Sequence, residues 1–158
     1  MPAPKFLADE MVGRLARYLR FVGCDTVYVR GLSDDEILHR LRDDPRMLLT
    51  RDRALARRAS SALLLVSPSL EDQWRAVRHE LPQLPTEVRF DRCSLCNGRL
   101  ESASPSRIAV RSEGVPWDRV DAGLPLFACA DCGHLFWDGS HTARIRRQIE
   151  AWNQDGAT

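Results

Sequence analysis

Short apolar runs alternate with helix-like segments up to residue 80, and this alternation constrains the fold more than any other feature of the chain. Each run is brief and mostly apolar, as buried strands are, and is followed by residues whose apolar positions recur at helical spacing. Strands are predicted at residues 5–8, 26–29, 47–50 and 62–66. Four strand–helix units in tandem predict an α/β fold with a parallel sheet flanked by helices.

Signals at the ends of these segments support the prediction. Gly23 follows the first helical pattern, at a position where glycine often ends a helix. Ser33 and Glu36 have the spacing of a capping box, and Ser69 is placed to cap the last helix of the series. The run at residues 62–66, ALLLV, is continuously apolar, so we expect its strand to be buried on both faces.

Cysteine spacing divides the chain in two. Two residues separate the members of each pair, and the pairs are Cys93 with Cys96 and Cys129 with Cys132. In a reducing compartment these pairs predict a tetrahedral zinc site, which is structural because four thiolates leave no open position. Prolines and the loss of helical periodicity before the first pair predict domains at residues 1–88 and 89–158. The fifth cysteine, Cys24, is predicted to be a small core residue.

Composition narrows the class of protein. The 158 residues suffice for one ordinary domain, or for a compact domain with a small appendage. All 23 basic residues except Lys5 are arginine, whose guanidinium group suits phosphate recognition. No apolar run reaches the roughly 18 residues of a membrane span. The first residues, MPAPKF, lack the apolar core of a signal peptide, so a cytoplasmic location is expected.

Acidic residues follow three of the predicted strands at the point where each strand ends. They are Asp9 and Glu10 after the first strand, Asp34, Asp35 and Glu36 after the second, and Asp52 after the third. The carboxyl ends of parallel strands meet at one edge of the sheet, where ligands bind in folds of this class. Carboxylates gathered there repel one another unless a cation is bound, and oxygen ligands suit Mg²⁺ or Mn²⁺. The sequence therefore predicts a divalent-metal site.

Each acid also has a structural explanation. Asp34 and Asp35 fall in the first turn of a predicted helix, where the helix dipole favours negative charge. Glu36 is explained by the capping box alone. Asp52 is placed to cap the helix predicted at residues 53–60.

Three stretches of the sequence resemble the Mut7-C RNase domain, a branch of the PIN-like nucleases. They are FLADEMVGRLARYLRFVGCDTVYV, LSDDEIL and LLTRDRALARRA. The resemblance covers nearly the whole chain, and it implies a PIN-like sheet followed by a small zinc ribbon and a C-terminal helix. It also implies metal-binding, catalytic roles for Asp9, Asp34 and Asp52 in the hydrolysis of RNA. A fourth acid, which many PIN domains carry after the fourth strand, has no clear match, since Glu71 and Asp72 lie at a helix start.

Candidate substrate-binding residues lie near these acids and after the second cysteine pair. They are Arg14 and Arg17 on the first helix, Thr50 and Arg51 beside Asp52, and His141 in a W-x-G-S-H stretch similar to one in the Mut7-C family. Arginines in these places are expected to hold an RNA backbone without reading its sequence, although a solvated arginine face is the alternative. Phe136 and Trp137 either form a strand end at the seam between the domains or stack on unpaired bases.

Two other classes of protein fit parts of this pattern. A response-regulator receiver would use Asp52 as its phosphate acceptor, but it needs a lysine after a fifth strand, and the chain has only Lys5. A non-catalytic RNA- or protein-binding module that keeps the PIN-like fold and zinc ribbon is the stronger alternative to a ribonuclease. Protein partners cannot be named from the sequence.

Overall fold

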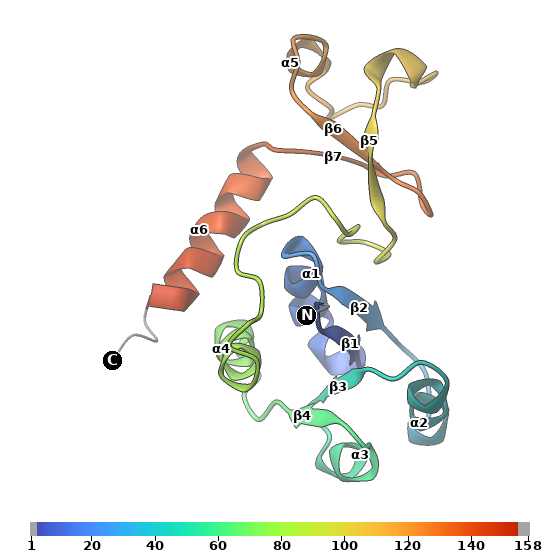
Figure 1. Ribbon diagram of the computed structural model, residues 1–158, viewed down its shortest axis with the longest axis vertical. Helices are drawn as coiled ribbons and strands as arrows, with labels where there is room; N and C mark the ends of the chain where they lie inside the picture. The colour runs from blue at the N-terminus through green and yellow to red at the C-terminus, as the bar shows by residue number, and fades with distance from the viewer. Residues whose placement is uncertain (1–2, 155–158) are drawn as a thin grey trace.

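The computed structural model describes residues 3–154, which form an α/β unit around a parallel sheet and a smaller antiparallel unit. Figure 1 shows the smaller unit beyond the upper end of the parallel sheet, with the last helix running back alongside the larger unit. The predicted fold class is confirmed. No helix within the described range is long and apolar enough to cross a membrane.

The parallel sheet positions the loops that carry the acids. Its strands are β1 (Lys5–Ala8), β2 (Asp25–Tyr28), β3 (Met47–Thr50) and β4 (Ala62–Leu64). They lie in the order β2-β1-β3-β4, and all neighbours are parallel. The chain winds from β1 to β2 on one side and then returns past β1 to β3, so the direction of winding reverses between β1 and β3. Such a reversal opens a crevice at the carboxyl ends of the strands.

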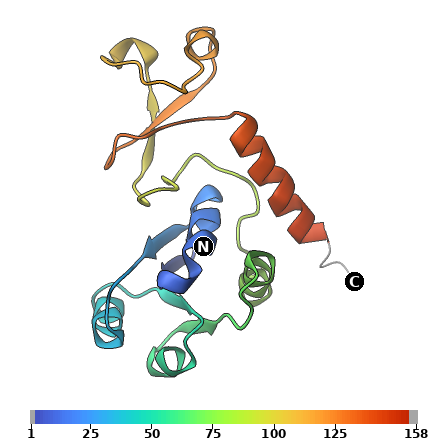
Figure 2. The ribbon, with the colours of Figure 1, turned by 180° about the vertical axis from the view of Figure 1, so that it is seen from behind.

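Helices cover both faces of this sheet (Figures 1 and 2). One face carries α1 (Gly13–Phe21), α4 (Leu70–Glu80) and α6 (Ser140–Gln154), and the other carries α2 (Asp34–Asp43) and α3 (Arg53–Arg58). The alternation of side chains along β1 explains the two cores, because Phe6 and Ala8 join the first cluster while Leu7 joins the second.

Three local features differ from the sequence prediction. β2 begins at Asp25, one residue early, and a 3₁₀ turn, η1 (Glu10–Val12), precedes α1. β4 is not buried on both faces: it is an edge strand, half-exposed, and it ends before Val66, which is 69% exposed. An apolar run reads alike at the edge and at the centre of a sheet, because composition does not record which strands lie beside it.

The smaller unit is a three-stranded antiparallel ribbon. Its strands β5 (Leu100–Ala103), β6 (Leu126–Cys129) and β7 (Leu135–Trp137) lie in that order, with η2 (Pro105–Arg107) and α5 (Trp117–Asp121) between β5 and β6. One cysteine pair precedes β5, and the other lies at the turn from β6 to β7.

Helix α6 follows the ribbon in the chain but contributes to the core of the larger unit. Ile145, Ile149 and Trp152 are buried in the same cluster as Trp74 of α4, whose indole nitrogen donates to Asn153 Oδ1 over 3.1 Å. Cys24 is fully buried in that cluster, as predicted. The proposed boundary at residue 88 therefore separates the two sheets, whereas the core of the larger unit extends into the C-terminal helix.

Candidate functional site

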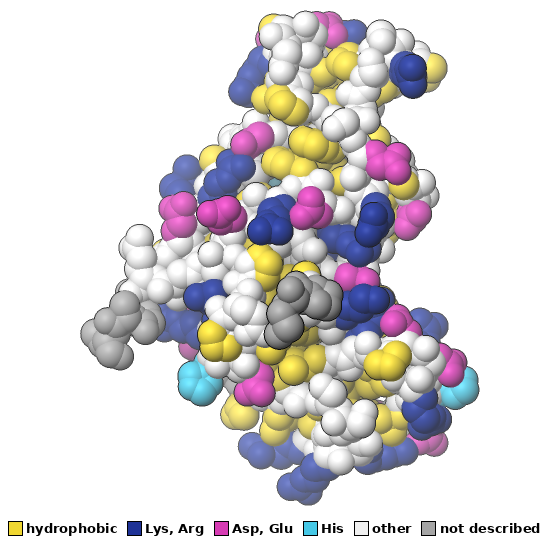
Figure 3. Space-filling view, in the orientation of Figure 1, with side chains coloured by type: hydrophobic (Ala, Val, Ile, Leu, Met, Phe, Trp, Pro, Cys, Tyr) yellow, Lys and Arg dark blue, Asp and Glu magenta, His cyan; other side chains and the backbone are white. Residues whose placement is uncertain are grey.

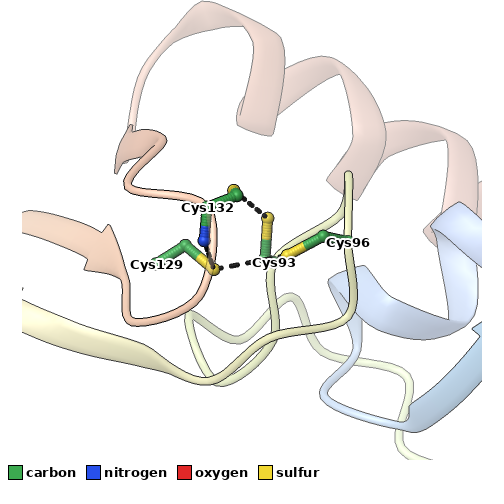
Figure 4. Close-up of side chains that lie close together, drawn as sticks. All are labelled: Cys93, Cys96, Cys129 and Cys132. Atoms are coloured by element: carbon green, nitrogen blue, oxygen red, sulfur yellow. Dashed lines mark hydrogen bonds between the residues drawn. The ribbon is translucent and has the colours of Figure 1, made fainter.

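The four paired cysteines lie together at one end of the ribbon (Figure 4). Their sulfur atoms all lie within 4.8 Å of one another. The Sγ atoms of Cys93 and Cys132 are 3.7 Å apart, and those of Cys96 and Cys129 are 3.4 Å apart. Tetrahedral zinc with bonds of about 2.3 Å places its sulfurs about 3.8 Å apart, so this cluster has the dimensions of a closed zinc site.

The backbone of each cysteine turn faces its sulfur atoms. The amide of Gly98 donates to Cys96 Sγ over 3.4 Å, and the amide of Cys132 donates to Cys129 Sγ over 3.5 Å. Gly98 has no room for a side chain, because a Cβ there would lie 2.6 Å from Cys129 Sγ. Burial disfavours the Cys129 thiolate, but hydrogen bonds from the turn amides and neighbouring thiols outweigh it and lower the pKa of Cys129 to about 7. The second turn therefore favours the Cys129 thiolate, whereas burial raises the pKa of Cys93 and Cys96, so zinc would have to displace their protons.

A second candidate site lies at the carboxyl ends of β1, β2 and β3. This hollow of about 110 Å³, the acidic hollow, is lined by the carboxylates of Asp9, Glu10, Asp34 and Asp52, together with apolar residues such as Val29 and Leu55. It includes all three acids that the sequence predicted to meet. Its position flanks the point where the sheet winding reverses, which is where ligands bind in such folds.

Asp9 lies deepest among these acids. Its side chain is 6% exposed; Oδ1 accepts from the amide of Met11 over 3.0 Å, and Oδ2 accepts from the hydroxyl of Thr50. Burial raises the pKa of Asp9, the two hydrogen bonds oppose the shift, and the charges of Asp52 and Glu10 add to it. The carboxylate of Asp9 is thus held in a defined position where its ionised form is unfavourable.

Asp52 and Asp34 each have a second role. Asp52 caps α3, since its Oδ1 accepts from the amide of Leu55 over 3.0 Å. Asp34 is half-exposed, and its Oδ2 lies 3.9 Å from Nη1 of Arg58, which also pairs with Asp35. Within residues 3–154 only the cysteines form a group whose ligand atoms all lie within 4.8 Å. The carboxylates therefore share a hollow without converging on one point.

Glu10 also lines the hollow; the sequence placed it among the acids at the strand ends but gave it no role as a metal ligand. It follows Asp9 directly, and its Oε2 accepts from the amide of Gly31 over 3.4 Å, so it joins the loops after β1 and β2. Two consecutive acids at the end of one strand could have indicated this role, because a single acid suffices to cap the following helix. Glu71 and Asp72 do not line the hollow: Glu71 pairs with Arg75 at 2.6 Å, and Asp72 accepts from the hydroxyl of Ser67 over 2.7 Å.

A basic groove adjoins the acidic hollow. This groove of about 480 Å³, the arginine groove, shares Glu10 and Met11 with the hollow and is lined further along by Arg14, Arg17, Arg20 and Leu95. Arg14 and Arg17 are exposed, as a phosphate-binding role requires. Arg20 is only 5% exposed, so it differs from its two neighbours on the helix and is not a solvated surface arginine.

The remaining predicted substrate residues lie in three different places. Thr50 is fully buried, and its Oγ1 both donates to Asp9 and accepts from the amide of Asp52 over 3.0 Å. Arg51 turns toward the end of β4, where its Nη2 lies 3.5 Å from the carbonyl oxygen of Val66. Basic side chains are gathered at that end of the molecule, around α3 (Figure 3).

His141 lies in the first turn of α6, away from the acidic hollow. Its ring packs edge-on against Phe21, with centroids 6.0 Å apart, and its Nδ1 is 2.9 Å from Nη2 of Arg144. Partial desolvation, followed by the charges of Arg144 and Arg17, lowers the pKa of His141. The imidazole is therefore held neutral at a junction between α1, α6 and the ribbon.

The fold and the two sites define a class: a three-layer α/β protein with carboxylates at the ends of parallel strands and a four-cysteine ribbon. The family model of the Mut7-C RNAse domain matches residues 4–149, which is nearly the whole chain. The protein belongs to this family. A search of curated proteins and a search of solved structures each returned no match.

Zinc content tests the cysteine cluster. We expect elemental analysis to find about one zinc per chain, and Cys129→Ser to lose zinc and loosen residues 90–140, because a hydroxyl is a poor zinc ligand. Cys24→Ala is the matched control, since Cys24 is buried away from the cluster in the helical core. Full zinc content in Cys129→Ser, or zinc loss in Cys24→Ala alone, would contradict the assignment.

The raised pKa of Asp9 predicts a pH dependence. A carboxyl whose pKa is higher in the folded than in the unfolded protein contributes stability that is complete below the unfolded pKa and is lost as pH rises through the folded pKa. Without added divalent metal, Asp9→Asn should escape this loss and match or exceed the melting temperature of the wild type at neutral pH. A wild-type protein that gains stability relative to the variant across the same pH rise would show that Asp9 stabilises the fold as a charged group.

Proposed function

We propose that the protein is a metal-dependent ribonuclease that hydrolyses phosphodiester bonds of RNA at the acidic hollow. The observation that carries the proposal is that Asp9, Asp34 and Asp52, from three separate loops, line one hollow at the reversal point of the sheet. Membership of a family described as an RNAse domain supports the same reaction class. The finer assignment to a PIN-like mechanism is our inference from the placement of these acids.

The donor set of the hollow fits a hard divalent cation. The polar side chains among its lining residues are all carboxylates, whose oxygens Mg²⁺ and Mn²⁺ prefer. Burial, to which the charges of Asp52 and Glu10 add, raises the pKa of Asp9. We assign Asp9, Asp34 and Asp52 as ligands, with Glu10 as the fourth acid. When bound, such a cation orients an attacking water and stabilises the oxygen that leaves the phosphorus.

The protein side chains hold this arrangement and bring the substrate to it. Thr50 fixes Asp9 through its hydroxyl and accepts from the amide of Asp52, so it links two of the acids. We therefore assign Thr50 a positioning role in place of direct contact with substrate. Arg14 and Arg17 bind phosphates in the arginine groove next to the hollow. Guanidinium groups bind phosphate through the backbone of any RNA, so the groove itself reads no sequence.

Reduced cysteines agree with a reducing compartment. All five cysteines are free in the structure, and four of them form the cluster that fits zinc. We infer that the protein acts in the cytoplasm, where such thiols persist.

A non-catalytic binding module remains the second candidate, and specific contacts favour it. Asp52 caps α3 and Asp34 lies beside Arg58, so both acids have a structural role that requires no metal. A carboxylate has two oxygens, however, and the cap uses only Oδ1 of Asp52. Capping and metal binding are thus compatible, and cleavage assays decide between the two functions.

Replacement of the acids by asparagine tests the reaction. Asp9→Asn and Asp52→Asn should each lower Mg²⁺- or Mn²⁺-dependent RNA cleavage about a hundredfold or more, because each removes a negative charge from the cation site. Asn still caps a helix, so the fold should survive in Asp52→Asn. The control is Asp35→Asn on the exposed side of α2, which should cleave as the wild type does.

The cleavage rates and metal-free melting temperatures together separate the two functions. Full activity in Asp52→Asn would refute its metal role. Lost stability with unchanged specific activity would assign Asp52 to the helix cap alone. No cleavage of RNA by the wild-type protein with either metal would favour the binding module.

The arginine groove predicts a salt-dependent affinity. Arg14→Gln with Arg17→Gln should weaken RNA binding for every sequence and flatten its dependence on salt, because fewer counterions are released from the phosphates. The matched control is Arg40→Gln with Arg42→Gln, which removes the same charge from exposed positions on α2. Equal salt slopes for the two double variants would show that Arg14 and Arg17 do not bind phosphate and are ordinary solvated surface residues.

A further inference from the structure

A pocket of about 310 Å³ lies between the ribbon and the larger unit, and we name it the seam pocket. Its lining is aromatic and basic. Aromatic rings come from Phe21, Phe136 and Trp137, and positive charge comes from Arg17 and Arg89. Arg92 also lines the pocket, but its guanidinium lies 3.7 Å from Asp25 Oδ2. None of the described residues that line it is acidic. A cavity with these properties suits a ligand that has both a flat ring and negative charge.

The indole of Trp137 is the most available of these rings. It lies against Gly139, where a Cβ would be 2.9 Å from Nε1, and the side chain is half-buried. The indole nitrogens of Trp74 and Trp117 donate to Asn153 Oδ1 and to the carbonyl of Ser112. By contrast, the indole N–H of Trp137 has no partner among residues 3–154. Trp137 is half-buried, and its Nε1 is not among the buried side-chain atoms that lack a partner, so solvent reaches this N–H and a ligand in the pocket can accept from it.

The seam pocket is continuous with the path to the acids. It shares Arg17, Ser94 and Leu95 with the arginine groove, and the groove shares Glu10 and Met11 with the acidic hollow. One arginine, Arg17, therefore faces both the pocket and the groove. A chain of phosphates leaving the pocket would meet basic side chains before it reaches the carboxylates.

We propose that the seam pocket binds one unpaired nucleotide of RNA, with the adjoining phosphates in the arginine groove and the chain continuing to the acidic hollow. The inference rests on the proposed function and names its substrate as single-stranded RNA. Aromatic stacking combined with a basic groove is how proteins hold unpaired nucleic acid. The pocket accommodates a single base and excludes a helix, in which the bases are already stacked and paired.

Binding of a labelled single strand tests the pocket. The probe is a single-stranded RNA of about 12 nucleotides, long enough to reach beyond one binding unit. Affinity is measured by fluorescence anisotropy without added divalent cation. Trp137→Leu, which keeps an apolar side chain but removes the ring, should weaken binding about tenfold, as expected for the loss of one stacked base. The duplex of the same sequence should bind more weakly than the single strand and should not respond to this change.

Trp117→Leu is the matched control, because Trp117 lies on α5 of the same ribbon and does not line the seam pocket. Its affinity should equal that of the wild type. Zinc content and melting temperature check the fold of both variants. If Trp137→Leu does not fold, His141→Ala replaces it, since His141 is exposed and lines the pocket. That variant should also bind RNA several-fold more weakly.

Equal affinities for the pocket variant and the control, or equal binding of single strand and duplex, would overturn the proposal. An acidic peptide that binds through Trp137 while RNA affinity is unchanged would overturn it as well. Cleavage assays distinguish a failure of the pocket proposal from a failure of the proposed ribonuclease activity. Metal-dependent cleavage that is insensitive to Trp137 at limiting substrate refutes the pocket alone. Binding that depends on Trp137 in a protein without cleavage refutes the ribonuclease alone.

Discussion

The buried guanidinium of Arg20 is the contact on which the arrangement of the two units depends. It is 5% exposed, and its Nε donates to the carbonyl of Thr26 over 2.9 Å. Its Nη1 donates to the carbonyls of Ser94 and Leu95 over 3.1 and 3.3 Å, within the first cysteine turn. Burial lowers the pKa of Arg20, while the neighbouring thiols act in the opposite direction. A buried cation is costly without such acceptors, so the fold of α1 requires the cysteine turn to be in place.

A second set of hydrogen bonds joins the same turn to β2. Asn97 has a left-handed backbone, with φ of 71°, and its Oδ1 accepts from the amide of Thr26 over 2.9 Å. Its Nδ2 donates to Asp25 Oδ1 over 2.7 Å, and Asp25 in turn holds Arg46 from the start of β3. Figure 3 shows basic and acidic side chains alternating across this junction. Because zinc would fix the geometry of the turn, a structural metal in the ribbon supports the edge of the parallel sheet.

These contacts also fix the relative positions of the sites along the path proposed for RNA. Arg14, Arg17 and Arg20 lie on one helix, α1, which begins beside the acidic hollow and ends against the ribbon. Arg20 fixes the ribbon to this helix, and Arg17 lines both the arginine groove and the seam pocket. The distance between the acids and the aromatic residues of the ribbon is therefore set by a rigid element. On the proposed path, a ribbon held in this way would contribute to substrate placement, although its four-cysteine cluster leaves no open position for chemistry.

Regular features of the fold could be predicted from the sequence, and contacts between distant segments could not. The capping box of Ser33 and Glu36 is local, and both of its hydrogen bonds are present. The cysteine cluster is the exception among distant contacts: its pairs lie more than 30 residues apart, but the need of one metal ion for four ligands predicted that they meet. The burial of Arg20 could not be predicted, because two of its three acceptors, the carbonyls of Ser94 and Leu95, lie 74 and 75 residues away in the chain. The packing of α6 against the larger unit could not be predicted either, because an amphipathic pattern shows that a helix packs but not against which partner.

Hydrogen bonds order the acidic hollow, which we propose as a cation site, without any bound cation. Thr50 donates its hydroxyl proton to Asp9 and accepts from the amide of Asp52, so one buried side chain fixes the ends of β1 and β3. The cap on α3 holds Asp52 through one oxygen, and the amide of Met11 holds Asp9 in the same way. Burial, to which the charges of Asp52 and Glu10 add, raises the pKa of Asp9, so without a cation this carboxylate holds a proton more readily than an exposed aspartate does. Hydrogen bonds that look purely structural thus position the carboxylates, and a divalent cation would replace the proton as the source of positive charge.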